Sequence, residues 1–107
     1  MSKENEVNVL RGEPVQIKIG KNEETVSRLS IDDQIVVMDI IQEAGEAKNA
    51  VAIERMIKII GIAVKREVTK NDFMFASEIV EAFNKIWIQN EFDFLLKEVG
   101  KVKLKAN

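Results

Sequence analysis

The 107-residue sequence contains no cysteine, no histidine and no tyrosine, and it has only one proline. Without cysteine the chain has no disulfide, no thiolate zinc site and no thiol nucleophile. Without histidine it lacks the side chain that most often serves as a general base or a metal ligand. The sequence therefore predicts a protein that is not an enzyme and that carries neither a cofactor nor a metal.

Long hydrophobic runs are also absent. No run of apolar residues exceeds four, whereas a membrane-spanning helix needs about 20. The first six residues are polar and acidic rather than typical of a signal peptide. We therefore expect a cytoplasmic protein of a bacterial or archaeal cell, without a membrane partner. Its 46% apolar and 32% charged residues predict a single globular domain over residues 1–107, with residues 1–6 and 101–107 flexible.

The charge is distributed unevenly along the chain. Residues 31–96 carry seven basic and twelve acidic residues, whereas residues 97–107 carry four lysines and one glutamate. An acidic body argues against a nucleic-acid partner, which normally needs clustered lysine and arginine. Nucleic-acid binding stays an alternative only through the basic tail together with Lys65, Arg66 and Lys70.

The first part of the chain has the alternating pattern of half-buried strands. Apolar residues alternate with polar ones at residues 7–10 and again at residues 15–19, and Arg11–Pro14 lies between them. This pattern predicts a β-hairpin over residues 7–19. Residues 20–29 are expected to form a polar connector, with only a weak signal for a further strand at residues 25–28.

The remainder of the sequence predicts helices over residues 31–44, 46–66 and 73–99. Ser30 begins one capping box and Thr69 another, and the third helix is expected to end before Gly100, with a break near Ser77. The tail after Gly100 is expected to be unstructured or to add a strand to the hairpin. The predicted fold class is α+β and mostly α: an N-terminal β-hairpin followed by three or four packed helices.

Residues capable of catalysis are present but have simpler explanations. Asp39 and Glu43 lie four residues apart on one helix face and could hold Mg²⁺, but a solvated acidic stripe accounts for them better. The serines and threonines have no histidine to activate them. The glycines lie too far apart for a phosphate-binding loop.

The second predicted helix has more apolar residues than one buried face requires. Eight of the twelve residues from Ile53 to Val64 are apolar, whereas an amphipathic helix needs three or four per two turns. We expect Ile57 and Ile60 in the core and a second backbone close to Gly61.

Two readings of this apolar excess stay open: neighbouring helices cover the second helix, or a residual patch meets another subunit or a client protein. We expect at least a dimer. The candidate protein-interaction surface consists of Val36, Val37, Ile40, Ile59, Ile62, Trp87, Ile88, Phe92 and Phe94.

The order of these features resembles one protein family, the tail assembly chaperones of long-tailed bacteriophages and related prophages. The segments that carry the resemblance are Val9–Ile19, Leu29–Gln34, Ile53–Arg66, Thr69–Asp72 and Ile79–Asn90. They cover most of the chain as a pattern, without a fingerprint residue. The resemblance implies a non-catalytic protein that binds tape-measure and tail-tube proteins during tail assembly and keeps their hydrophobic helices soluble.

Two other functions remain alternatives at this point. One is a small cytoplasmic adaptor or regulatory protein that acts through helix-mediated contacts with other proteins. The other is a small-molecule-binding or enzymatic domain, which would need a pocket lined by polar groups. Tail and tape-measure genes beside the gene for this chain would favour the chaperone.

Overall fold

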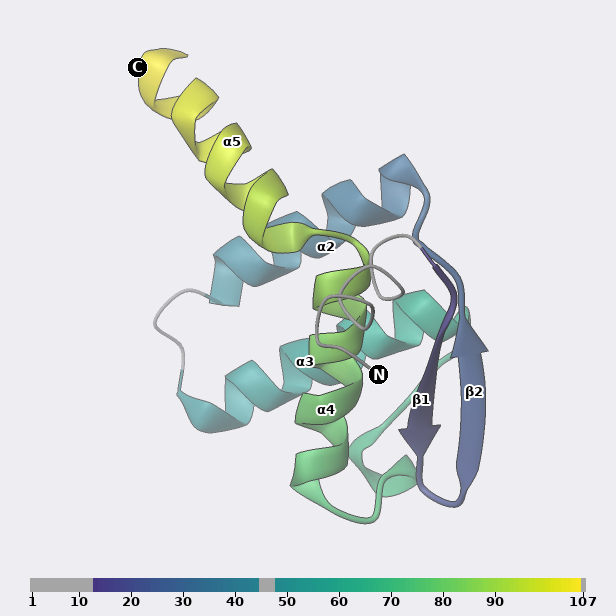
Figure 1. Cartoon of the computed structure of the whole chain (residues 1–107). Coiled ribbons are helices and arrows are strands. Elements are labelled where there is room, and N and C mark those ends of the chain that lie inside the picture. Colours follow the sequence, from purple (N-terminus) through teal and green to yellow (C-terminus); the bar gives the residue numbers. More distant parts are fainter. Residues whose placement is uncertain (1–12, 45–47, 107) are drawn as a thin grey trace.

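The computed structural model describes residues 13–44 and 48–106. Figure 1 shows a two-stranded hairpin beside a set of helices, which confirms the predicted α+β, mostly α fold. The elements in chain order are β1 (Val15–Ile19), β2 (Asn22–Val26), α2 (Ile31–Ala44), α3 (Asn49–Val64), the short 3-10 helix η1 (Lys70–Asp72), α4 (Ala76–Gln89) and α5 (Phe92–Ala106).

Strand β1 has the alternation that the sequence predicts. Val15, Ile17 and Ile19 are buried, whereas Gln16 and Lys18 between them are exposed. The buried side of β1 packs against α4. Because successive side chains of a strand point to opposite faces, the apolar residues of β1 point into the core and the polar ones point away from it. A two-stranded hairpin is marginal alone in water, and this helix supplies the cover that it needs.

The partner of β1 differs from the sequence expectation. Strand β2 pairs antiparallel with β1, so that Val15 lies opposite Val26, and the predicted polar connector is wrong over residues 22–26. The predicted strand at residues 7–10 lies outside the described residues. Gly20 makes the tight turn with a φ of +64°, a conformation that glycine adopts without a steric cost.

Helix α3 lies at the centre of the domain, between α2 and α4 (Figure 1). Ile57 and Ile60 are buried, as predicted, and Ile60 is completely inaccessible to solvent. The rest of the buried apolar core is contributed by the hairpin, the segments flanking α2 and α3, and the other helices: Val15, Ile17, Ile19, Val26, Leu29, Val37, Ile40, Ile59, Ala63, Val68, Ile79, Ala82, Ile86 and Phe92.

Helix α3 ends at Val64 rather than at Arg66, because Lys65 adopts a left-handed conformation with a φ of 61°. The backbone N–H of Arg66 then donates to the carbonyl oxygen of Gly61 over 3.1 Å. A Cβ atom on Gly61 would lie 3.0 Å from the Arg66 carbonyl oxygen. The predicted close approach of a backbone to Gly61 is thus confirmed, and that backbone is the chain leaving the same helix.

The expected break near Ser77 is confirmed, because residues 73–75 are not helical and α4 begins at Ala76. A second break, at Asn90 and Glu91, was not expected and divides the rest of the third predicted helix into α4 and α5. Glu91 has a φ of 55°, which ends α4 and redirects the chain into α5. The predicted capping break at Thr69 is confirmed: its backbone N–H donates to Asp72 Oδ2 over 2.8 Å and forms the turn of η1.

Helix α5 continues through Gly100 to Ala106. The predicted end before Gly100 is therefore wrong, and so are both expectations for the tail, an unstructured segment and an added strand. Apart from its chain neighbours and the backbone of its own helix, no atom of the described residues lies within 4 Å of a Cβ placed on Gly100. Figure 1 shows α5 projecting from the rest of the domain. Its base is held by the buried side chain of Phe92.

The start of α4 is fixed by the buried carboxylate of Glu78. Its Oε1 accepts hydrogen bonds from the backbone N–H groups of Met74 at 2.7 Å and of Phe75 at 3.2 Å. Its Oε2 lies 3.7 Å from Lys18 Nζ on β1. The Met74 hydrogen bond, the Phe75 hydrogen bond and the Lys18 charge together outweigh burial and lower the pKa of Glu78 below its ordinary value of 4.5.

A pKa that folding lowers links stability to pH. The Glu78 contribution is complete above pH 4.5 and is lost as the pH falls through the lower pKa of the folded state. We therefore expect the Glu78→Gln variant to unfold at a lower urea concentration than the wild type at pH 7. The gap between their urea midpoints should narrow at pH 3, because Glu78 of the wild type then loses part of its contribution, whereas the other carboxylates titrate alike in both proteins. An equal gap at both pH values would contradict this assignment.

Candidate functional site

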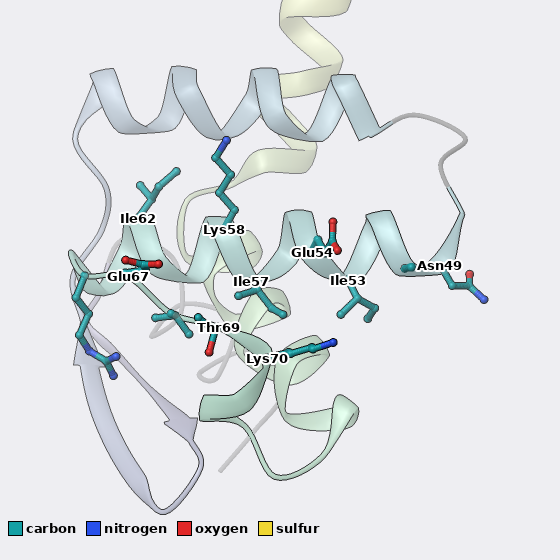
Figure 2. Close-up of a pocket in the computed structure, with 13 residues that line it drawn as sticks. Asn49, Ile53, Glu54, Ile57, Lys58, Ile62, Glu67, Thr69 and Lys70 are labelled. Carbon is teal, nitrogen blue, oxygen red and sulfur yellow. The ribbon is translucent and has the colours of Figure 1, made fainter.

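The described residues form an apolar groove along α3, called the α3 groove below. It has a volume of about 890 Å³ and runs between one side of α3 and the segment of residues 66–70. Ile53, Ile57 and Ile62 line it from the helix, and Thr69 lines it from the segment opposite (Figure 2). Val68 of that segment lines it as well.

The groove exists because the chain turns back on α3 after Lys65. The left-handed residue reverses the chain, and Gly61 lets the returning backbone lie against the helix without a Cβ in the way. Val68 is then buried against α3, whereas Ile53 and Ile62 remain only partly buried. The groove is therefore a product of the local sequence 61–68 as well as of helix packing.

The polar groups of the groove lie on its rim. Glu54, Lys58, Glu67 and Lys70 are exposed and contribute both signs of charge. Arg66, at one end, forms an ion pair with Glu24 of β2. A rim of mixed sign does not select an occupant by charge, so the apolar floor must supply most of the binding free energy.

The length of the groove suits an elongated occupant. Its lining extends from Asn49 to Ile62 along α3, which corresponds to about 20 Å at 1.5 Å of rise per residue. Three to four turns of a second helix would match this length. Such a helix would bury apolar side chains spaced three and four residues apart.

The lining of the groove contains few groups that take part in chemical steps. Thr69 is its one hydroxyl-bearing side chain, and that hydroxyl lies 3.4 Å from Asp72 Oδ2. Across residues 13–44 and 48–106, no group of three or more acidic side chains is placed to hold a metal ion. The arrangement can bind apolar side chains, and the Thr69 hydroxyl takes part in the capping box that begins η1.

Four residues of the predicted interaction surface are corrected by the structure. Val37, Ile40, Ile59 and Phe92 are buried in the core. Helix α3 packs against both α2 and α4, so an apolar residue outside the main stripe of α3 need not face solvent. For these four positions, the reading in which neighbouring helices provide the cover is the right one.

The other five predicted residues lie at or near the surface. Val36, Ile88 and Phe94 are exposed, on α2, α4 and α5 respectively. Trp87 is half-buried, and its Nε1 donates to Asp93 Oδ1 over 3.0 Å. Ile62 alone among the nine lines the α3 groove.

The remaining apolar groove residues were missed as site residues. Ile53 belonged to the apolar excess of the second predicted helix, and Val68 stood in an unassigned connection. The one local signal was Gly61, whose position inside a helix indicates the close approach of another backbone.

Comparisons of the chain with protein-family models, curated proteins and solved structures return no match. Among the helices of the described residues, none combines the length and the apolar character needed to cross a membrane.

Proposed function

We propose that this chain is a non-catalytic, cytoplasmic tail assembly chaperone of a bacteriophage or prophage. In this function the α3 groove receives hydrophobic helical segments of tape-measure and tail-tube proteins while the tail is assembled. The observation that carries the proposal is the groove itself: an apolar floor about 20 Å long with polar groups on its rim.

A helix fits the groove better than a small molecule does. The volume of about 890 Å³ lies within the range of small-molecule pockets, but such pockets also place a few polar groups where they fix the ligand. Here the polar side chains of Glu54, Lys58 and Lys70 are exposed on the rim. That layout favours an occupant with one apolar face and one solvated face.

Unassembled hydrophobic helices need such cover. A tape-measure segment with an exposed apolar face would aggregate before it found its partners. The groove has an apolar floor and a rim with charges of both signs, so it would bind a helix by burying apolar side chains rather than through a specific pattern of hydrogen bonds. Several related helical segments could therefore bind to it. The groove by itself supports only the binding of hydrophobic helices. The choice of tail assembly proteins as clients comes from the resemblance of the sequence pattern to that family.

Co-expression tests the proposal directly. The tape-measure protein whose gene lies closest to the gene for this chain would be produced with and without the chain, and its soluble fraction measured. We expect the wild type to keep it soluble. Ile53→Lys should weaken binding by about ten-fold or more, because an ammonium group in the apolar groove loses its hydration.

The matched control is Val80→Lys, which makes the same change at an exposed position on α4 outside the groove. It should behave as the wild type does. Equal solubility of the tape-measure protein without the chain would contradict the chaperone function. Binding only to an already folded protein, with the same loss in Ile53→Lys, would identify the adaptor function instead.

A further inference from the structure

Helix α5 has a basic outer face. The side chains of Phe92, Leu95 and Leu96 are buried or partly buried toward the domain. On the opposite side of the helix, Phe94, Lys97 and Lys101 are exposed, and this set is called the α5 face below. Phe94 keeps 59% of its surface accessible. Lys101 also forms an exposed ion pair with Glu98 of the same helix over 3.4 Å, so the face combines two lysines, one of them paired within the helix, with one large apolar side chain.

Helix α2 has an outer face that is acidic and partly apolar, and it therefore complements the α5 face. Its first turn contains Asp32 and Asp33, and its last turn contains no basic residue. The exposed residues on one side of the helix, called the α2 face below, are Ile31, Asp32, Ile35, Val36, Asp39 and Glu43. Across the described residues, none of the three acids of this face forms an ion pair.

From these two faces we infer that the chain forms a two-fold symmetric dimer. In it the α5 face of each copy packs on the α2 face of the other. Asp39 and Glu43 lie four residues apart on α2, and Lys97 and Lys101 lie four residues apart on α5. Two helices packed along each other can therefore place both opposite charges in register, and the apolar side chains fill the contact between them.

One copy cannot make this contact with itself. The α5 face points away from its own domain, because the opposite side of α5 is the side that packs on the core. Within the copy, α5 contacts α2 through Lys103, whose Nζ donates to Gln42 Oε1 over 2.8 Å. A second copy is therefore needed to pair the two faces.

The position of the two helices permits a closed dimer. Figure 1 shows α2 and α5 at the same end of the molecule, with α5 projecting beyond the rest of the domain. One two-fold axis at that end would pair both faces at once, so the contact closes rather than extending into a filament. A projecting helix of 15 residues is also marginal without tertiary cover, and the partner would provide that cover.

The α3 groove does not offer α5 the same match. Its rim carries both signs of charge, including Lys58 and Lys70, which would repel the lysines of the α5 face. The inference is independent of the proposed function, since a chaperone or an adaptor could equally be a dimer.

Charge exchange between the faces tests the inference. The full-length chain would be studied by sedimentation equilibrium at micromolar concentration and low salt. We expect the wild type at twice its chain mass of 12.1 kDa. Lys97→Glu/Lys101→Glu and Asp39→Lys/Glu43→Lys should each associate about ten-fold or more weakly, because like charges then face each other. An equimolar mixture of the two variants should regain the dimer, since both of its contacts again pair opposite charges.

Several results separate this dimer from other states. A wild type that sediments as a monomer throughout would overturn the inference. If either double variant by itself stays dimeric, the interface lies elsewhere. The same conclusion follows if the mixture of the two variants associates no more strongly than each variant does by itself. All four changes are at exposed positions, so circular dichroism should show each variant folded. High salt should weaken the wild-type dimer, because it screens exposed charge pairs.

Discussion

Replacing Ile60 by aspartate should prevent the domain from folding. Ile60 lies in the middle of α3 and is completely inaccessible to solvent. An unpaired carboxylate at this position costs several kcal/mol, which is comparable with the whole stability of about 5–15 kcal/mol of a typical domain. We expect far-ultraviolet circular dichroism to show the loss of most of the helical signal.

A milder substitution allows the contribution of Ile60 to the free energy of unfolding to be measured. Ile60→Ala should leave the domain folded and lower the free energy of unfolding by about 2–5 kcal/mol, through lost burial and the cavity left behind. The matched control is Val51→Asp, at an exposed position in the first turn of α3. There the helix dipole favours an acidic residue, so the control should stay within about 0.5 kcal/mol of the wild type. A folded Ile60→Asp variant would show that α3 is not central.

The fold was predictable where a residue has one dominant reason for its conformation. The period of two at Val15, Ile17 and Ile19 and the capping residues Ser30 and Thr69 act locally, and each appears in the structure as expected. Strand β2 has no such signal, because three of its five residues are Asn22, Glu23 and Glu24, and only Val26 is buried. Its conformation is set by pairing with β1, which is a tertiary cause.

The ends of the helices also differ in whether a local residue or the tertiary structure sets them. Lys65 and Glu91 both adopt left-handed conformations, although neither is the glycine or asparagine that usually marks such an end. The surrounding structure imposes these conformations, so the predicted helices run too far at both places. Gly100 shows the opposite case: glycine often marks the end of a helix, but here it lies inside α5.

The candidate site followed from the sequence only in part. The apolar excess of α3 indicated that the helix is covered on several sides, and Gly61 indicated a nearby backbone. Neither feature says which apolar residues a neighbour covers. Ile59 is covered and Ile53 is only partly so, and this difference depends on where α2, α4 and the segment of residues 66–70 lie. The groove is a consequence of that tertiary arrangement.

Asn90 should prove the most important polar side chain for stability. It is completely buried between α4 and α5. Its Oδ1 accepts hydrogen bonds from the Leu29 backbone N–H at 2.9 Å and from Gln34 Nε2 at 3.2 Å. Its Nδ2 donates to the Ile86 carbonyl oxygen at 2.9 Å. One amide thus joins the end of α4 to the start of α2.

Its neighbour Gln89 extends this network to the hairpin. Gln89 is also completely buried, and its Nε2 donates to the carbonyl oxygens of Glu13 and Val26 at 2.9 and 2.8 Å. Asn90 Nδ2 lies 3.3 Å from Gln89 Oε1. The two side chains hold the hairpin, α2 and α4 in one arrangement, so their loss should be felt by all three elements.

We expect Asn90→Leu to lower the free energy of unfolding by about 2–4 kcal/mol. The change keeps the volume but leaves the Leu29 N–H and one Gln34 donor buried without their acceptor, at about 1–3 kcal/mol for each such group. Urea denaturation measures this loss, and Asn71→Leu at an exposed position is the matched control. Hydrogen exchange should show the Leu29 amide protected in the wild type and exposed to exchange in Asn90→Leu.

A double-mutant cycle separates the hydrogen bond from general packing. If Gln34 acts through Asn90 Oδ1, the effects of Gln34→Leu and Asn90→Leu should fall short of additivity by about 0.5 kcal/mol or more, because the second change removes a partner already lost. Additive effects, or an Asn90→Leu variant as stable as the Asn71→Leu control, would mean that the contact between α2 and α4 depends on apolar packing alone. The buried amides would then be satisfied in some other way, since a buried N–H without a partner is rarely tolerated.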